Sequence, residues 1–172
     1  MQKQVSFGEA NRLKFPEQVV IALAKDEAGK CNPITLGWAM QTSISPPMLA
    51  ISIGLGRYSH DVFHRAGEFV IAMPSADQQA ETLFYGTKSG RDVDKLEAFG
   101  AALAPAGEIE GVLLADAVAN FECRKVGELL TGDHTIFVGE VVRSHVNEVE
   151  RDRLYTVAAG HTMGGLSRGV SP

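Results

Sequence analysis

The segment Gly56–His60 brings together groups that could hold a phosphate. Arg57 supplies a guanidinium and Ser59 a hydroxyl, and both can donate hydrogen bonds to phosphate oxygens. Ser59 also precedes a short helical pattern over 60–65, with Gly67 just beyond its end, so Ser59 is the expected N-cap. Free backbone N–H groups and the dipole at a helix start attract anions. The segment therefore predicts a local site for one phosphate group.

Two further stretches are polar where strands and loops would otherwise be apolar. The first runs from Asn32 to Trp38 and continues from Thr42 to Pro47. It holds the only tryptophan, beside glycine and hydroxyl residues that leave room for a planar ligand. The second is Ser89–Lys95, to which Gly132–Thr135 is added later in the chain. Taken alone, both stretches also fit ordinary core, turn and helix-surface positions.

Three other motifs carry less weight. Gly165–Gly169 matches the G-x-S-x-G pattern of a nucleophile elbow, but the Asp and His of a triad would have to follow, and the chain ends three residues later. Gly54–Gly56 begins like a dinucleotide fingerprint, but position 59 is a serine. His60 and His64 lie four apart on the expected helix, as in metal hydrolases, but with Asp61 in place of glutamate. A solvated helix face is favoured over a metal site about fourfold there, so no metal is expected.

The composition limits the class of protein. The chain has 172 residues, 45% apolar and 22% charged, which fits a single globular domain over residues 1–172 rather than a disordered chain. The formal net charge of −5 and the lack of a Lys/Arg block argue against nucleic acid or an anionic membrane as partner. No apolar stretch has the length of a signal peptide or a bilayer span. Since Cys31 and Cys123 form no disulfide or metal pattern, a cytoplasmic protein with free thiols is expected.

Short apolar runs separated by turn residues predict many strands. The expected strands are 19–23, 48–55, 68–73, 112–119, 121–126, 135–142 and 154–157, with one further run over 34–44. Besides 60–65, helices are expected over 75–85, with Ser75 as cap and Leu83 and Phe84 in the core, and over 92–99, with Asp92 as cap. Strands and helices do not alternate regularly, so a doubly wound parallel sheet is disfavoured. The pattern predicts a mainly antiparallel β-barrel with peripheral helices.

In their order along the chain, these motifs resemble the flavin reductase-like family of FMN-binding split barrels, which includes flavoredoxins and ferric reductases. The resemblance covers the chain from Pro16 to Gly165. It rests on six motifs, each weak alone: Asn32–Trp38, Ser45–Pro47, Gly56–His60, Gly67–Val70, Ser89–Lys95 and Gly132–Thr135. The resemblance implies an FMN-binding split β-barrel of antiparallel Greek-key type, and a homodimer with FMN near the subunit interface.

The resemblance also implies roles for individual residues. Family positions near the isoalloxazine and ribityl chain are matched by Asn32, Thr35 and Trp38, and those at the polar edge of the ring by Thr42 and Ser43. The phosphate end is matched by Arg57 and Ser59, with Tyr58 between them as a further cofactor-binding residue, and positions at or beside the flavin by Lys95 and His134. A cation there would stabilise the reduced, anionic flavin, and His134 could assist the reaction; flavin N5 itself carries the chemistry.

Each role has an ordinary structural alternative. The alternatives are a core position for Trp38, edge-strand hydrogen bonds for Thr42 and Ser43, an N-cap for Ser59, an ion pair with Asp92 or Asp94 on an exposed helix face for Lys95, and a braced turn for His134.

The function implied by the resemblance is that of an oxidoreductase. It would take hydride from NADH or NADPH, with the nicotinamide stacked on the flavin, and pass electrons to free flavin, a ferric complex or a partner protein. The alternatives are a flavoredoxin-like electron carrier without its own NAD(P)H step and a non-catalytic flavin-binding barrel. The sequence departs from the family pattern after Gly164-Gly165, where members carry an aromatic residue and this chain has Leu166.

Overall fold

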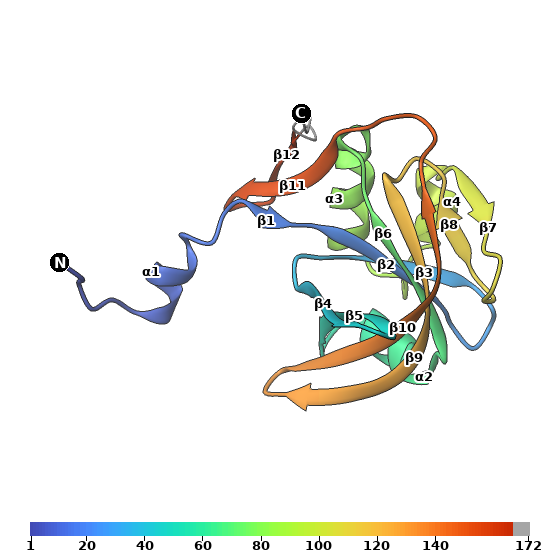
Figure 1. The fold of residues 1–172 in the computed structure, drawn as a ribbon, viewed down its shortest axis with the longest axis horizontal. Coiled ribbons are helices and arrows are strands. Elements are labelled where there is room, and N and C mark those ends of the chain that lie inside the picture. Colours follow the sequence, from blue (N-terminus) through green and yellow to red (C-terminus); the bar gives the residue numbers. More distant parts are fainter. Residues whose placement is uncertain (167–172) are drawn as a thin grey trace.

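The main element of the structure, a computed structural model that describes residues 1–166, is a seven-stranded antiparallel sheet (Figure 1). Its strands lie in the order β3-β2-β6-β9-β10-β5-β4. Their bounds are β2 Val20–Lys25, β3 Cys31–Leu36, β4 Ala39–Ile44, β5 Pro47–Gly54, β6 Glu68–Met73, β9 Ala119–Thr131 and β10 His134–Val146. Because β5 lies beside β10 and not beside β6, strands β5, β6, β9 and β10 form a Greek key. The predicted mainly antiparallel β class is confirmed.

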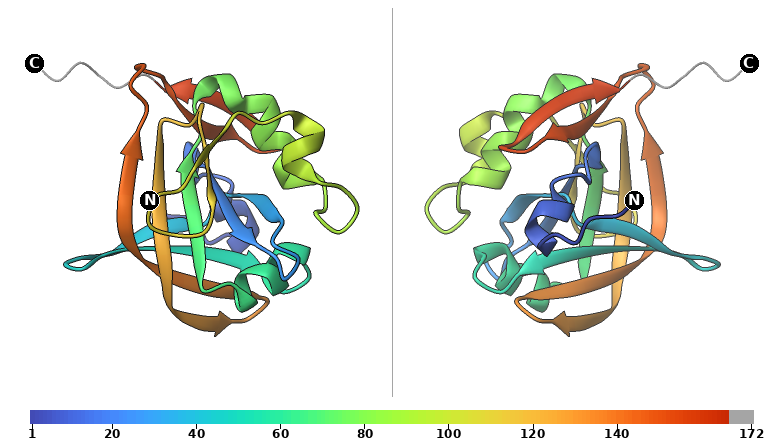
Figure 2. Two further views of the ribbon diagram at one scale, coloured as in Figure 1. Left: turned by 90° about the vertical axis from the view of Figure 1, so that its right-hand side faces the viewer. Right: turned by 90° about the vertical axis from the view of Figure 1, so that its left-hand side faces the viewer.

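Smaller elements surround this sheet. A three-stranded sheet contains β1 (Glu17–Gln18), β11 (Arg153–Ala158) and β12 (Thr162–Leu166), and a two-stranded one contains β7 (Leu103–Pro105) and β8 (Val112–Leu114). The helices are α1 Phe7–Asn11, α2 Tyr58–Arg65, the 3₁₀ turn η1 Ala76–Gln78, α3 Gln79–Thr87 and α4 Lys95–Phe99. Helix α1 lies on an N-terminal arm apart from the body, and α2 and the α3–α4 pair lie on different sides of the main sheet (Figures 1 and 2).

Strands β2 and β6 are buried on both faces, which explains their unbroken apolar sequences. In β2, Val20, Ala22 and Ala24 belong to a core cluster that includes α2, whereas Ile21 and Leu23 belong to a second cluster that includes α3, α4 and β8. Strand β6 alternates between the two clusters in the same way. A strand between two cores lacks the polar alternation of a half-exposed strand, so these two segments are the easiest to predict.

Most predicted strands are present, and the errors have local causes. The strand 68–73 has the predicted bounds, but the run 34–44 is two strands, separated by Gly37 and Trp38. The run 112–119 contributes only Val112–Leu114 before a turn. Strands β1, β7 and β12 were not predicted, because β1 is a polar pair, β7 has only three residues in a stretch of small residues, and β12 contains Gly164-Gly165.

The predicted helix caps at Ser59 and Asp92 are wrong. Helix α2 starts two residues earlier than predicted, with Arg57 at the N-cap position, so Ser59 lies inside its first turn. Helix α4 is capped by Asp94, whose carboxylate accepts a hydrogen bond from the Glu97 N–H at 3.1 Å. In the helix predicted over 75–85, Leu83 is exposed and the buried aromatic residue is Tyr85.

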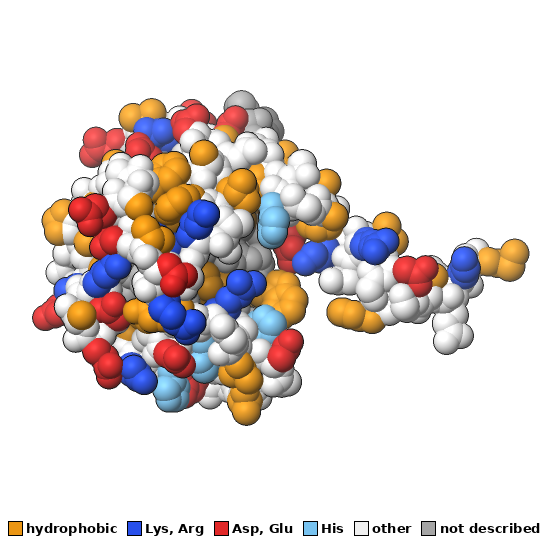
Figure 3. Space-filling view, turned by 180° about the vertical axis from the view of Figure 1, so that it is seen from behind, with side chains coloured by type: hydrophobic (Ala, Val, Ile, Leu, Met, Phe, Trp, Pro, Cys, Tyr) orange, Lys and Arg blue, Asp and Glu red, His pale blue; other side chains and the backbone are white. Residues whose placement is uncertain are grey.

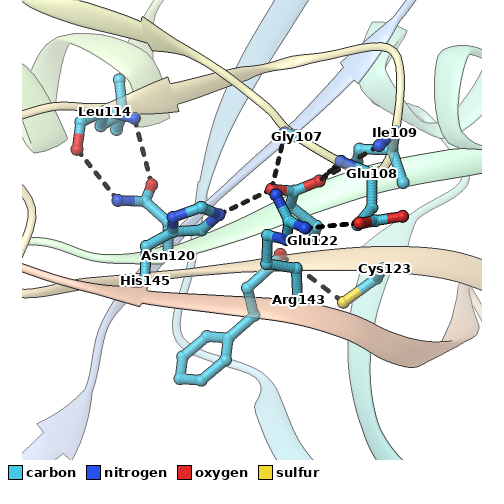
Figure 4. A network of polar contacts seen from close by, with 10 residues as sticks. Gly107, Glu108, Ile109, Leu114, Asn120, Glu122, Cys123, Arg143 and His145 are labelled. Carbon is cyan, nitrogen blue, oxygen red and sulfur yellow. Dashed lines mark hydrogen bonds and ion pairs between the residues drawn. The ribbon is translucent and has the colours of Figure 1, made fainter.

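A buried carboxylate fixes the loop 106–111 to the main sheet. Glu122 of β9 is fully buried and accepts hydrogen bonds from the N–H groups of Gly107, Glu108 and Ile109 at 2.6–3.1 Å (Figure 4). His145 Nε2 of β10 lies 2.6 Å from the same carboxylate. Burial alone would raise the pKa of Glu122, but these four hydrogen bonds outweigh it and lower the pKa.

A tight contact between β6, β9 and β10 predicts a large difference between two glycine variants. A Cβ atom at Gly139 would lie 2.5 Å from Phe69 Cζ and 2.8 Å from Cys123 Cβ, whereas a Cβ at Gly127 of the same hairpin meets nothing within 4 Å. Gly139→Ala is therefore expected to lower the free energy of unfolding by about 1–3 kcal/mol through overpacking, and Gly127→Ala by less than about 0.5 kcal/mol. Urea unfolding of the two variants measures this; equal midpoints would contradict it.

Candidate functional site

Four of the six sequence motifs, with seven of the predicted site residues, converge on one cavity of about 710 Å³. Its walls come from β3, the Gly37-Trp38 link, the start of α2, the end of α3 with the following loop, the start of α4 and β10, and the β11–β12 hairpin. The predicted site residues in these walls are Thr35, Trp38, Arg57, Tyr58, Ser59, Lys95 and His134. A hollow with Lys, Arg and His side chains around it lies near the base of the N-terminal arm (Figure 3).

The start of α2 forms one end of the cavity. Within residues 1–166 no side chain caps this helix. The His60 N–H donates to the Arg57 carbonyl at 2.9 Å, which leaves the N–H groups of Tyr58 and Ser59 available to a ligand. Ser59 is buried in the first turn, and its Oγ accepts a hydrogen bond from Asn32 Nδ2 at 2.8 Å. Arg57 and Arg91 line the same end, and the Arg91 guanidinium lies 5.8 Å from the centre of the Tyr58 ring. The helix N–H groups, the Ser59 hydroxyl and the two arginine side chains suit a phosphate, because all of them can donate hydrogen bonds and the arginines are cations.

Lys95 places a buried cation in the wall. Its side chain is 2% exposed, and its Nζ donates to the Tyr85 carbonyl at 3.2 Å. Burial lowers the pKa of Lys95 to about 8. The alternative of an exposed ion pair with Asp92 or Asp94 is wrong, since Lys95 is buried and Asp94 pairs with Lys30 at 3.6 Å. A buried ammonium without a carboxylate partner in residues 1–166 favours an anionic ligand beside it.

Trp38 and His134 form an aromatic pair in the wall. Their ring centroids lie 4.6 Å apart, and Trp38 is 52% exposed, so the alternative of a core tryptophan is wrong. His134 Nδ1 lies 2.7 Å from an Asp133 carboxylate oxygen, and this hydrogen bond lowers the pKa of Asp133. The contact braces the turn, as the structural alternative for His134 predicts. Of the His134 ring atoms, Nε2 would lie nearest to a Cβ atom placed at Gly54, which is also a residue of the cavity wall.

The structure does not bring every predicted residue into the cavity. Asn32 is not among the residues of the cavity wall, but its Nδ2 donates to Ser59 Oγ, which belongs to that wall. Thr35 lies in the wall, and its hydroxyl donates to the Thr82 carbonyl at 2.5 Å. Thr42 and Ser43 lie on β4, outside the cavity wall, on the hairpin with β5 that projects from the body (Figure 2). Their role at the flavin ring stays a prediction.

Some wall residues were not singled out by the sequence. Lys14, Phe15 and Glu17 come from the base of the N-terminal arm, and Lys88 from the end of α3. His161 comes from the β11–β12 turn, where its φ of 60° is unusual for a residue other than glycine. Lys88 directly precedes the motif Ser89–Lys95, whereas the other four lie outside the six motifs and no local pattern marks them.

The His60–His64 pair serves two separate contacts. The rings stack with centroids 6.2 Å apart, but His60 hydrogen-bonds Thr135 at 2.9 Å while His64 pairs with Glu128 at 2.9 Å. Within residues 1–166, no three His, Cys, Asp or Glu residues are grouped so that they could hold a metal. In the same range no helix is long and apolar enough to cross a membrane. In the G-x-S-x-G pattern, the part from Ser167 onwards lies outside the described residues.

Comparison with known proteins points to one family. The flavin reductase like domain matches residues 12–163. FMN reductase (NADH) SmoA of Agrobacterium fabrum is 33% identical over 90% of this chain and 82% of its own. A protein of Archaeoglobus fulgidus without an assigned function is 37% identical over 66% of this chain, and the match spans 64% of that relative, less than two thirds of its length.

Solved structures agree on the fold. The flavoredoxin of Methanosarcina acetivorans has a TM-score of 0.86 at 22% identity, covering all of this chain and 95% of the other. The flavoredoxin of Desulfovibrio vulgaris has a TM-score of 0.85 at 19% identity, covering all of this chain and 97% of the other. These likenesses show the FMN-binding split-barrel fold, and the domain match shows more: the chain belongs to the flavin reductase-like family.

Proposed function

We propose that this protein is an FMN-containing oxidoreductase that takes hydride from NADH or NADPH and passes electrons to free flavin, a ferric complex or a partner protein. One observation carries the proposal: in a chain of the flavin reductase-like family, phosphate donors, a buried cation and an aromatic pair line a single cavity. A relative over most of the chain is named as an NADH-dependent FMN reductase, which supports the reaction class.

The residues of the cavity fit FMN. Arg57, Ser59 and the start of α2 can receive a phosphate. The buried Asn32 Oδ1 has no hydrogen-bond donor among residues 1–166, and a ribityl hydroxyl is a donor of the right kind. Trp38 offers a partly exposed ring for contact with a planar ligand.

A bound flavin would supply the redox chemistry, namely hydride acceptance from a reduced nicotinamide and transfer of two electrons to an acceptor. The protein orients the reactants and stabilises charge. Arg57 and Ser59 hold the phosphate, Lys95 offsets negative charge on the ligand, and Trp38 with His134 forms the wall beside it. Asp133 fixes the ring of His134 through the 2.7 Å contact with Nδ1, so its Nε2 has a constant position at the cavity wall.

We also propose that two copies of the chain form a homodimer with FMN near their interface. The β4–β5 hairpin supports this, because it projects from the body and exposes Met40 and Ile44, the latter 85% exposed (Figure 2). Thr42 and Ser43 lie on the same hairpin, so a dimer could bring them to a flavin that they do not reach within one chain.

The absorbance spectrum of the purified protein, with FMN added if it is colourless, tests the proposal. Flavin bands are expected, and NADH or NADPH under anaerobic conditions should bleach them rapidly. Bleaching by dithionite but by neither nucleotide would instead identify the protein as an electron carrier without its own NAD(P)H step. A protein that takes up no FMN would contradict the proposal altogether.

A further inference from the structure

Asn32, the second residue of β3, acts on the cavity through one hydrogen bond. Asn32 and Ser59 are 2% and 4% exposed, and Asn32 Nδ2 donates to Ser59 Oγ at 2.8 Å. An amide nitrogen can only donate, so Ser59 Oγ is the acceptor in this bond. The single proton of the Ser59 hydroxyl is therefore free for a different acceptor, and Ser59 lies in the cavity wall.

The side chain of Asn32 is held in place by close packing against a glycine. A Cβ atom at Gly90 would overlap Asn32 Oδ1, and it would lie 3.0 Å from Asn32 Cγ and 3.1 Å from Tyr58 Cδ1. Only a residue without a side chain lets the loop 89–92 approach Asn32 this closely. Loop, amide and the first turn of α2 thus form one packed unit.

We infer that Asn32 is a positioning residue: it makes the Ser59 hydroxyl a dedicated donor and so favours flavin that carries a phosphate over flavin that does not. The inference rests on the proposed function, in which the start of α2 holds the FMN phosphate. Phosphate oxygens without a proton only accept hydrogen bonds, and they match a hydroxyl whose lone pair is already engaged. Riboflavin ends in a hydroxyl that lacks this negative charge and gains less from the same donor.

A double-mutant cycle measured by flavin fluorescence tests this. Ser59→Ala is expected to lower FMN affinity about tenfold, and riboflavin affinity less than about twofold. Asn32→Ala should reduce FMN affinity more than riboflavin affinity in the wild-type background. In the Ser59→Ala background, Asn32→Ala should lower the affinities for FMN and riboflavin by the same factor, because any direct contact of Asn32 with the ribityl chain is common to both ligands. An Asn32→Ala effect on FMN that is the same in both backgrounds overturns the inference.

A pair of glycine variants gives an independent readout. Gly90→Ala displaces the Asn32 amide and should lower the ratio of FMN to riboflavin affinity, as Asn32→Ala does. Gly67→Ala is the control, because a Cβ there meets nothing within 4 Å and Gly67 lies outside the cavity wall. An unchanged ratio in a folded Gly90→Ala protein contradicts the inference, while the proposed function stands if the wild type binds FMN. A wild type that binds neither flavin overturns both.

Discussion

Replacing Lys95 by methionine is expected to weaken FMN binding at least about tenfold, because it removes a buried cation from the cavity wall. Wild-type affinity for FMN should fall as the pH rises through about 8, where the Lys95 ammonium of the free protein loses its proton. The Lys95→Met protein should lack this step. Fluorescence titrations between pH 6.5 and 9.5 measure both effects, and an identical pH profile in the variant would contradict them.

The same substitution should change how stability depends on pH. Burial lowers the pKa of Lys95 to about 8 from the ordinary value of 10.5, so between these limits the unfolded chain binds more protons than the folded one. The free energy of unfolding therefore rises with pH across this window, by on the order of 3 kcal/mol from this group. The difference in unfolding free energy between wild type and Lys95→Met isolates the contribution. Lys25→Met is the control, since Lys25 lies near the surface and pairs loosely with Glu110 at 3.5 Å.

Replacing Glu122 by leucine is expected to destabilise the fold by about 3–5 kcal/mol. The change leaves the N–H groups of Gly107, Glu108 and Ile109 without their acceptor and His145 without its partner (Figure 4). Glu122→Gln should cost less, since an amide oxygen replaces part of the carboxylate. Urea unfolding gives the free energies, and amide hydrogen exchange should show faster exchange in the loop 106–111.

Glu122 should also contribute to acid sensitivity. Its pKa is lowered in the folded state, so its stabilising effect is present above the unfolded value of about 4.3 and is lost as the pH falls through the folded value. Glu122→Gln should flatten the loss of stability over that range. Glu128→Gln, which removes partly exposed pairs with His64 and Lys125, is the control and should cost less than about 1 kcal/mol. A flat wild-type profile below pH 5 would contradict this role for Glu122.

The sequence was informative where local pattern and burial coincide. Strands β2 and β6 lie between two cores, so their runs of apolar residues have no polar interruption, and β6 was predicted with its observed bounds. Helix starts were predicted less well. Ser59 and Asp92 are good capping residues by type, but Arg57 and Asp94 hold those positions, because packing of the adjoining strand and loop decides where the helix begins.

Four of the six motifs proved to contribute to the cavity wall, whereas Gly67–Val70, Ser45–Pro47 and the β4 segment with Thr42 and Ser43 lie outside it. What a single stretch could not show is which residues meet. Asn32 and Ser59 are 27 positions apart and share one hydrogen bond, and the Trp38 ring meets His134 from the other end of the chain.

The sequence by itself determined the strand-rich fold class and predicted a local segment that could hold a phosphate, because periodicity and donor types are properties of neighbouring residues. The tertiary structure decided that Lys95 is buried rather than paired at the surface, that Trp38 is exposed to the cavity, and that the base of the N-terminal arm and the β11–β12 hairpin complete the wall. These outcomes depend on which distant segments pack together, since burial and hydrogen-bond partners arise only when the strands have formed their sheet.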